Sequence, residues 1–186
     1  MRVTRQQAAR NRGRIVAAAA RLFRERGFDG VGVDAIMRHA GLTHGGFYGH
    51  FASKDALAAE ATARALDDSM RWQDGLGSLH ELLLQYLSMR HREDRAKGCP
   101  VAALGGDVAR QGPAARLVLT AGIRAQVSRI AGLLKSGTPK ARRRQAIATY
   151  AGMVGALVLA RAVAEPALAE EILAATRDTF GEEHAA

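Results

Sequence analysis

The chain has 186 residues, of which 48% are hydrophobic and 24% are charged. This composition excludes a miniprotein and a disordered chain, because there is enough apolar material for a sizeable core. Aromatic residues make up only 5% of a chain rich in Ala and Leu, whereas a β-sandwich or barrel needs many β-branched and aromatic residues. The sequence therefore predicts an all-α fold.

Positive charge is concentrated towards the amino terminus of a chain whose net charge is +9. Residues 1–60 carry ten Lys and Arg residues against five Asp and Glu residues, and the segment from Arg2 to Arg14 contains five Arg and no acid. A basic arm of this kind suits a polyanion, either nucleic acid or an anionic membrane surface, and a solvated tail is the alternative.

The cysteine and hydropathy patterns indicate a reducing, cytoplasmic environment. A single cysteine excludes an internal disulfide. The apolar run that begins at Ile15 is short and ends at Arg21, so it does not resemble an export signal. The longest apolar stretch, 151–160, ends at Arg161, and a membrane-spanning helix needs roughly 20 residues. We therefore expect a cytoplasmic protein with no membrane partner.

Apolar residues recur at helical spacing along the chain, and turn residues divide the pattern into segments. Thr43 and Ser53 are suitable N-caps for the third and fourth segments. The pattern predicts helices over residues 11–26, 33–40, 44–49, 54–72, 79–92, 101–110 after Pro100, 113–135, 140–164 and 166–180.

The helices predicted over 33–40 and 44–49 are short, amphipathic and joined by Gly41 and Leu42, which is the plan of a helix-turn-helix. The second helix needs one apolar face against the first, so that its other face can enter a DNA major groove. The apolar residues available for this contact are Leu42, Phe47 and Phe51 on one side and Val33, Ile36 and Met37 on the other. Any compact helical hairpin would show a similar pattern.

The residues from Gly41 to Leu57 narrow these alternatives. They contain Tyr48, a Phe three residues later, and Ser-Lys-Asp at the start of the next helix. This segment resembles the recognition segment of TetR-family transcription regulators, and the resemblance covers residues 10–57. It implies a TetR-like all-α fold with a helix-turn-helix domain over 1–52 and a helical effector-binding and dimerisation domain over 53–186.

The resemblance also implies roles for individual residues. Tyr48 and Lys54 would bind DNA phosphates, and Thr43 would cap the recognition helix and touch the backbone, all without reading the base sequence. His44 would reach base edges or a phosphate from the first turn. The remaining residues of the helix start, Gly45 and Gly46, would allow close approach to the groove, although the segment could also be a simple turn.

Two positions depart from the family pattern. Family members often carry a hydroxyl residue that caps the second helix and touches phosphate, whereas this chain has Gly32, which can cap but has no side chain to donate. Phosphate binding is therefore expected to rely more on the arm residues Arg2, Arg5 and Arg10 and on backbone amides at helix starts. Family members often have an aromatic residue directly before the Phe that is Phe51 here, whereas this chain has His50. A phosphate contact and a packing role both stay open for His50.

The carboxy-terminal helices are expected to form a homodimer interface. The helices over 140–164 and 166–180 would pack against their twofold mates, with packing inside one chain as the alternative. The residues proposed for this contact are the small Ala148, Gly152, Gly155 and Ala156 and the larger Tyr150, Val154, Leu157, Ile172 and Leu173. Candidates for an effector pocket, for which core packing is the alternative, are Trp72, Tyr86, Met89 and Phe180.

Cys99 is a candidate sensor residue. It stands in Lys97-Gly98-Cys99-Pro100 at a predicted helix start, where backbone amides and the nearby Arg95 and Lys97 favour the thiolate. Some TetR-type regulators with a Gly-Cys at this junction respond to electrophiles or oxidants through that thiol, so the resemblance implies a subgroup marked by this Gly-Cys-Pro. A small buried apolar role is the alternative.

The sequence thus predicts a transcription regulator, most simply a repressor that a small molecule, an electrophile or thiol modification releases from a palindromic operator in double-stranded DNA. No P-loop, dinucleotide-binding turn, nucleophile elbow or zinc-type Cys/His pairing is present in the sequence, so we expect no cofactor, no metal and no enzyme activity. The alternatives are a nucleoid-type protein that binds DNA without sequence preference and a thiol enzyme built on Cys99.

Overall fold

A computed structural model describes residues 4–182 of the chain. Every regular element in this range is a helix, as the sequence predicts. In chain order the elements are α1 (Arg5–Arg26), α2 (Val33–His39), the 3-10 helix η1 (His44–Gly49), α3 (Lys54–Trp72), α4 (Leu79–Tyr86), α5 (Met89–Glu93), α6 (Pro100–Arg110), α7 (Pro113–Leu133), α8 (Pro139–Ala162) and α9 (Pro166–Glu182).

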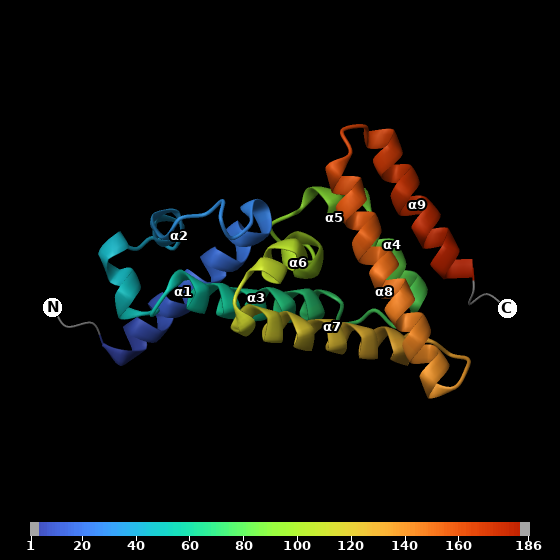
Figure 1. Ribbon diagram of the computed structural model, residues 1–186, viewed down its shortest axis with the longest axis horizontal. Helices are drawn as coiled ribbons and strands as arrows, with labels where there is room; N and C mark the ends of the chain where they lie inside the picture. The colour runs from blue at the N-terminus through green and yellow to red at the C-terminus, as the bar shows by residue number, and fades with distance from the viewer. Residues whose placement is uncertain (1–3, 183–186) are drawn as a thin grey trace.

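The molecule is elongated, and its two ends are built from different helices (Figure 1). α1, α2 and η1 form one end, and α8 and α9 form the other. The long helices α3 and α7 pack against each other and connect the two ends, and α6 packs against α1, α3, α7 and α8. The first end therefore meets the second through α3, α6 and α7.

Each end of the molecule is built around its own apolar core. The first core is centred on fully buried side chains of α1, α2, η1 and α3, together with residues of α6 and α7; its members include Ile15, Phe23, Ile36, Phe47, Leu57, Leu104 and Val108. Packing is thus continuous across residue 52, where the sequence analysis divides the chain, and that division stays a prediction. The second core joins α4, α7, α8 and α9 through residues such as Leu83, Ile130, Met153, Leu157 and Leu173.

α8 belongs to the second core although it is long and apolar enough, by length and composition, to cross a membrane. Met153, Leu157 and Ala160 are each 0% exposed on one of its faces. α7 and α9 pack against α8. These contacts are typical of a helix in a protein core. Such a helix can be as long and as apolar as a membrane-spanning one.

The first helix begins earlier than the sequence predicts. α1 starts at Arg5 because Thr4 caps it, with the Thr4 hydroxyl accepting from the Gln7 amide at 3.1 Å. Arg5 and Arg10 therefore lie on the first turns of a helix rather than on an extended arm. Arg2 lies outside the described residues.

The prediction of a single helix over 79–92 is wrong, because the structure has two helices, α4 and α5, in this range. The chain turns at Leu87, which has φ −92° and ψ 62°. Ser88 then caps α5 by accepting from the His91 amide at 3.2 Å. A Ser hydroxyl binds backbone amides at helix starts better than it fits a helix interior, and this preference outweighs the apolar periodicity.

Candidate nucleic-acid interface

A tight turn sets the direction of η1 relative to α2. Gly41 adopts φ +66°, a conformation that favours glycine. The Gly41 amide donates to the Arg38 carbonyl at 2.9 Å, and the Leu42 amide donates to the Met37 carbonyl at 2.9 Å. These bonds close the carboxyl end of α2 and fix the chain direction into η1.

The underside of η1 is anchored by Phe47, which is 0% exposed. Its ring lies 5.8 Å from the Phe51 ring and is part of the first core with Ile36 and Met37. Leu42 and Val33 are partly buried against the same core. The apolar contact predicted between the two short helices is therefore present.

The opposite side of η1 faces solvent. Tyr48 is 72% exposed, although its ring edge still packs on Phe47 with the centroids 5.2 Å apart. His44 is also exposed, and its Nδ1 lies 3.8 Å from an Asp34 carboxylate oxygen. Tyr48 is thus held on the surface by its buried neighbour Phe47, and the His44 ring lies exposed beside Asp34.

Thr43 occupies the N-cap position of η1, but the predicted side-chain cap is absent. η1 is a 3-10 helix, and its first bond runs from the Gly46 amide to the Thr43 carbonyl at 3.1 Å. The exposed Thr43 hydroxyl has no hydrogen-bond partner among the residues the structure describes, which leaves it available to a ligand.

Nothing inside the chain requires glycine at positions 45 and 46. A Cβ at Gly45 would meet no atom within 4 Å, and one at Gly46 would make ordinary contact with Met37 Cε at 3.6 Å. Neither residue has a positive φ. A Cβ at either position would therefore affect an external partner more than the fold.

Helix starts and a basic residue border this surface. Ser53 caps α3, accepting from the Ala56 amide at 3.1 Å, so Lys54 is the first helical residue as predicted. Gly32 is the N-cap of α2 and makes no side-chain bond. His50 is the partly buried C-cap of η1. Free amides at helix starts and a nearby lysine suit phosphate oxygens.

One arginine of the predicted basic arm is engaged elsewhere. Both guanidinium NH groups of Arg12 donate to the Glu60 carboxylate, and this bond raises the pKa of Arg12. The guanidinium carbon lies 4.5 Å from the centre of the Phe51 ring. Arg12 thus ties α1 to α3 beneath the recognition segment, a role that the sequence pattern did not indicate.

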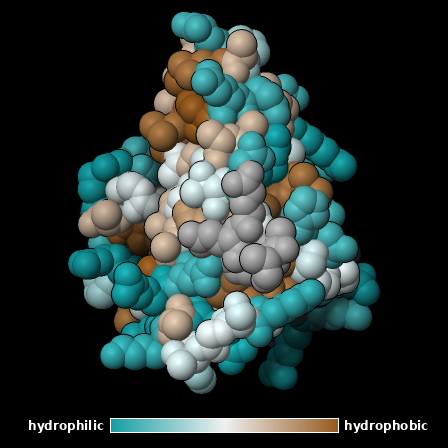
Figure 2. Space-filling view, turned by 90° about the vertical axis from the view of Figure 1, so that its right-hand side faces the viewer, coloured by the Kyte–Doolittle hydropathy of each residue, from teal (hydrophilic) through white to brown (hydrophobic). Residues whose placement is uncertain are grey.

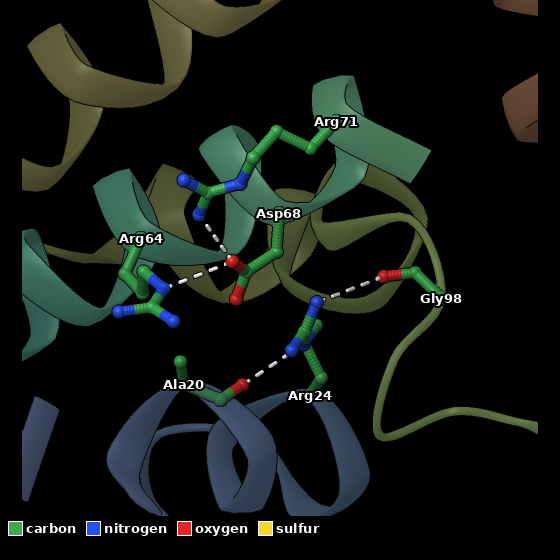
Figure 3. Close-up of polar contacts among 6 residues, drawn as sticks. All are labelled: Ala20, Arg24, Arg64, Asp68, Arg71 and Gly98. Atoms are coloured by element: carbon green, nitrogen blue, oxygen red, sulfur yellow. Dashed lines mark hydrogen bonds and ion pairs between the residues drawn. The ribbon is translucent and has the colours of Figure 1, made fainter. Parts of the chain in front are cut away.

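A buried arginine connects the first end of the molecule to the segment before α6 (Figure 3). Arg24 of α1 is 5% exposed, and it donates to the Ala20 carbonyl at 2.9 Å and to the Gly98 carbonyl at 3.3 Å. Burial lowers the pKa of Arg24, while the charges of Asp68 and Asp94 act in the opposite direction. Gly98 immediately precedes the predicted sensor Cys99.

A second contact joins the same regions. The Phe28 amide donates to the Asp107 carboxylate of α6 at 3.0 Å. Gly27 has φ +74°, and a Cβ there would lie 2.6 Å from the Asp107 carboxylate. α6 is therefore fastened to the carboxyl end of α1 through a turn that only glycine accommodates easily.

Cys99 is 4% exposed and lies at the N-cap of α6. Its amide donates to His91 Nε2 at 2.9 Å, and its Sγ lies 3.9 Å from the Tyr150 hydroxyl. The cations predicted beside it, Arg95 and Lys97, are exposed. Arg161 of α8 is a partly buried cation of this region, and it donates to the carbonyls of His91 at 2.9 Å and Arg92 at 3.2 Å.

His91 is held as a neutral ring behind Cys99. Its Nε2 accepts from the Cys99 amide, so the proton is on Nδ1, which donates to the Tyr86 carbonyl at 2.7 Å. Burial is the main cause that lowers the pKa of His91 to about 4. No sequence pattern indicated this histidine, because its partners Tyr86 and Cys99 lie at the ends of other helices.

The far end of the molecule carries exposed apolar side chains (Figure 2). Ile147, Val158 and Leu159 of α8 and Leu168 of α9 are between 39% and 56% exposed. Several residues predicted for a dimer contact are instead buried inside the chain; they are Tyr150, Ala156, Leu157 and Leu173. Gly152 makes room for Phe180 of the same chain, since a Cβ there would lie 2.4 Å from Phe180 Cε2.

Of the residues predicted for an effector pocket, some are packed in the second core and one lines a cleft. Tyr86 is buried in the second core, and Met89 and Phe180 pack against it. Trp72 lines a cleft. Among residues 4–182, no group of three or more His, Cys, Asp and Glu side chains is placed to hold a metal ion.

Comparisons with known proteins agree with this geometry. The family described as bacterial regulatory proteins, tetR family, matches residues 15–61. An uncharacterized HTH-type transcriptional regulator of Bacillus subtilis, YdgC, is 36% identical over 74 residues, which are 37% of this chain and 38% of that protein. The chain thus matches less than half of the length of this curated relative.

Solved structures match over nearly the whole chain. A TetR transcriptional regulator from Chloroflexus aurantiacus has a TM-score of 0.77 at 26% identity, covering 95% of both chains. A TetR-family regulator from Cytophaga hutchinsonii has a TM-score of 0.80 at 20% identity, covering 97% of this chain and 98% of that one. The reduced form of E. coli NemR shares the fold with a TM-score of 0.72 at 22% identity, covering 92% and 95%.

The α2–η1 unit has the arrangement of a helix-turn-helix, and the whole fold is that of solved TetR-type structures. The chain resembles the tetR family through its amino-terminal region, where the family model matches residues 15–61, and shares the whole fold of the TetR regulator from Chloroflexus aurantiacus.

Proposed function

We propose that the protein is a sequence-specific DNA-binding regulator that represses transcription from a palindromic operator. The observation that carries the proposal is η1, whose Phe47 is buried while Tyr48 and His44 face outwards beside two glycines that the fold itself does not need. This arrangement can place η1 in a major groove with Tyr48, Thr43 and Lys54 on phosphates. We propose a cytoplasmic protein without enzyme activity or cofactor.

Dimerisation supplies the second recognition element. The exposed apolar residues of α8 and α9 support a contact between two copies through this end, because large apolar side chains exposed together mark interaction surfaces. A twofold dimer presents its two η1 segments to successive major grooves, which lie about 34–36 Å apart. A change in this separation would prevent both from binding at once.

Release is proposed to act through the segment before α6. Modification of Cys99 would disturb Gly98 and α6, and these bind Arg24 and Phe28 at the carboxyl end of α1. These contacts support our proposal that the chain belongs with the regulators marked by a Gly-Cys-Pro at this junction. N-ethylmaleimide is expected to lower the DNA affinity of the wild type but not of a Cys99→Ser variant; equal loss in both proteins would reject the thiol route.

The experiment that tests the function is selection of bound duplexes from a random pool by the full chain. We expect an enriched inverted repeat, bound at least about 10³-fold more tightly than unrelated DNA. The net charge of +9 favours a second candidate, a nucleoid-type protein held by phosphates alone. Equal affinity for all duplexes would support that candidate and overturn the proposal.

A further inference from the structure

A cleft of about 460 Å³ lies between the end of α3, the α4–α5 region and the segment before α6. Its volume is in the range of small-molecule sites. The residues that line it and enter the argument are Trp72, Arg90, His91, Asp94, Lys97 and Gly98. The cleft is remote in sequence from the helix-turn-helix, and nothing in the DNA-binding geometry uses it.

One wall of the cleft is a supported aromatic surface. Trp72 is the chain's single tryptophan and is 45% exposed. Its ring lies 5.7 Å from the His91 ring at an angle of 39°, and the His91 ring meets Tyr86 edge-on at 4.6 Å. Because His91 is also held by hydrogen bonds at both nitrogens, Trp72 packs against a fixed neighbour and offers a face for stacking.

The ionisable groups around the cleft favour an anion. The side chains of Arg90 and Lys97 make no hydrogen bond or ion pair with any residue in the described range, and both are exposed. The one acidic lining residue, Asp94, already accepts from the Lys97 amide at 3.2 Å. His91 is neutral at ordinary pH because burial lowers its pKa to about 4. Two cations without partners thus face one partly engaged carboxylate.

We propose that this cleft binds a small planar carboxylate, with its ring on Trp72 and its charge between Arg90 and Lys97. This inference rests on the proposed function, because the carboxylate is proposed as the effector that controls DNA binding. Gly98 forms part of the lining, and its carbonyl accepts from Arg24 of α1. A ligand in the cleft therefore contacts a segment bonded directly to the DNA-binding end.

The test is titration of the full-length protein with benzoate and 2-naphthoate by calorimetry, with Trp72 fluorescence as a second readout for benzoate. Benzamide and cyclohexanecarboxylate are the matched ligands that lack the charge or the planar ring. Saturable binding of the two aromatic acids is expected, with benzamide and cyclohexanecarboxylate at least about tenfold weaker.

Variants assign the site. Arg90→Gln and Lys97→Gln are each expected to weaken aromatic acid binding about three- to tenfold, since each removes one charge-assisted contact. Trp72→Leu should weaken aromatic acid binding, measured by calorimetry, more than either charge variant does. The matched controls Arg116→Gln and Lys135→Gln remove exposed cations of α7 and the loop after it and should change nothing. Absence of saturable binding, or equal effects of site and control variants, overturns the proposal.

The same preparations are assayed for binding to a selected duplex without any acid present. Specific DNA binding together with no acid binding leaves the proposed function standing and removes this inference. Acid binding at the mapped residues together with no specific DNA binding keeps the carboxylate site and overturns the proposed function.

Discussion

At the scale of single residues, Tyr48 and Lys54 are expected to hold phosphates rather than read bases. Tyr48→Phe removes one hydroxyl bond and should weaken all duplexes about three- to tenfold alike. Lys54→Ala should do the same and reduce the slope of log affinity against log salt by about 1. Fluorescence anisotropy on specific and unrelated duplexes at several salt concentrations measures both effects. An unchanged salt slope for Lys54→Ala contradicts its role.

His91 makes folding stability dependent on pH. Its pKa of about 4 in the folded chain lies below the ordinary value of 6.5, so the folded state binds fewer protons than the unfolded state between these values. Its contribution is complete above about pH 6.5 and is lost as the pH falls towards 4, by roughly 3 kcal/mol in total.

Urea unfolding of the wild type and of His91→Gln at a series of pH values isolates this effect. Glutamine keeps a polar side chain but does not titrate, so the variant should lose less stability than the wild type between pH 7 and pH 4. Parallel stability curves for the two proteins would show that His91 is not buried as a neutral ring.

The positions of side chains were predictable where they depend on neighbours in sequence. The exposure of Tyr48 and the place of Lys54 follow from a local motif and a cap. Arg12 and Arg24 were not predictable, because their partners Glu60 and Gly98 lie 48 and 74 residues away. Thr43 failed as a cap for a subtler reason: its role assumed an α-helix where the chain forms a 3-10 turn.

At the scale of elements, η1 is the piece whose surface must fit a groove. Gly45→Ala adds a methyl group to open space, so the free energy of unfolding should stay the same or rise by up to about 1 kcal/mol. DNA affinity should nevertheless fall, because the methyl group separates η1 from the bases.

Gly106→Ala in α6 is the matched control, since a Cβ there also meets no atom within 4 Å. It should gain similar stability without losing DNA affinity. Thermal unfolding and DNA titration of both variants make the comparison. If Gly45→Ala binds DNA as well as the control does, η1 does not approach the groove closely.

Helix positions were largely predictable because caps and stop residues are local signals. Pro100, Pro113 and Pro166 all open helices as expected. The division between α4 and α5 was missed because a periodic apolar pattern continues through Ser88. Which face of α8 is buried also depends on contacts with α7 and α9, so periodicity alone could not assign it.

At the scale of the whole molecule, two polar contacts join the DNA-binding end to α6 and to the segment before it. Asp107→Ala leaves the Phe28 amide without its partner and should cost about 1–2 kcal/mol of unfolding free energy. It should also reduce the effect of N-ethylmaleimide on DNA affinity, because α6 is then less firmly connected to α1.

Asp178→Ala removes an exposed acid of α9 and serves as the control. Both variants are compared by urea unfolding and by DNA titration before and after N-ethylmaleimide. The same loss of response in both, or in neither, would exclude Asp107 from the connection.

The proposed dimer places two η1 segments in successive major grooves of one operator. The most direct test of this placement is a methylation-protection footprint of the full chain on a selected duplex. We expect two protected patches of major-groove guanines about 34–36 Å apart, one helical turn, on the same side of the DNA. A uniform footprint, or a single patch from a monomer, would contradict this placement.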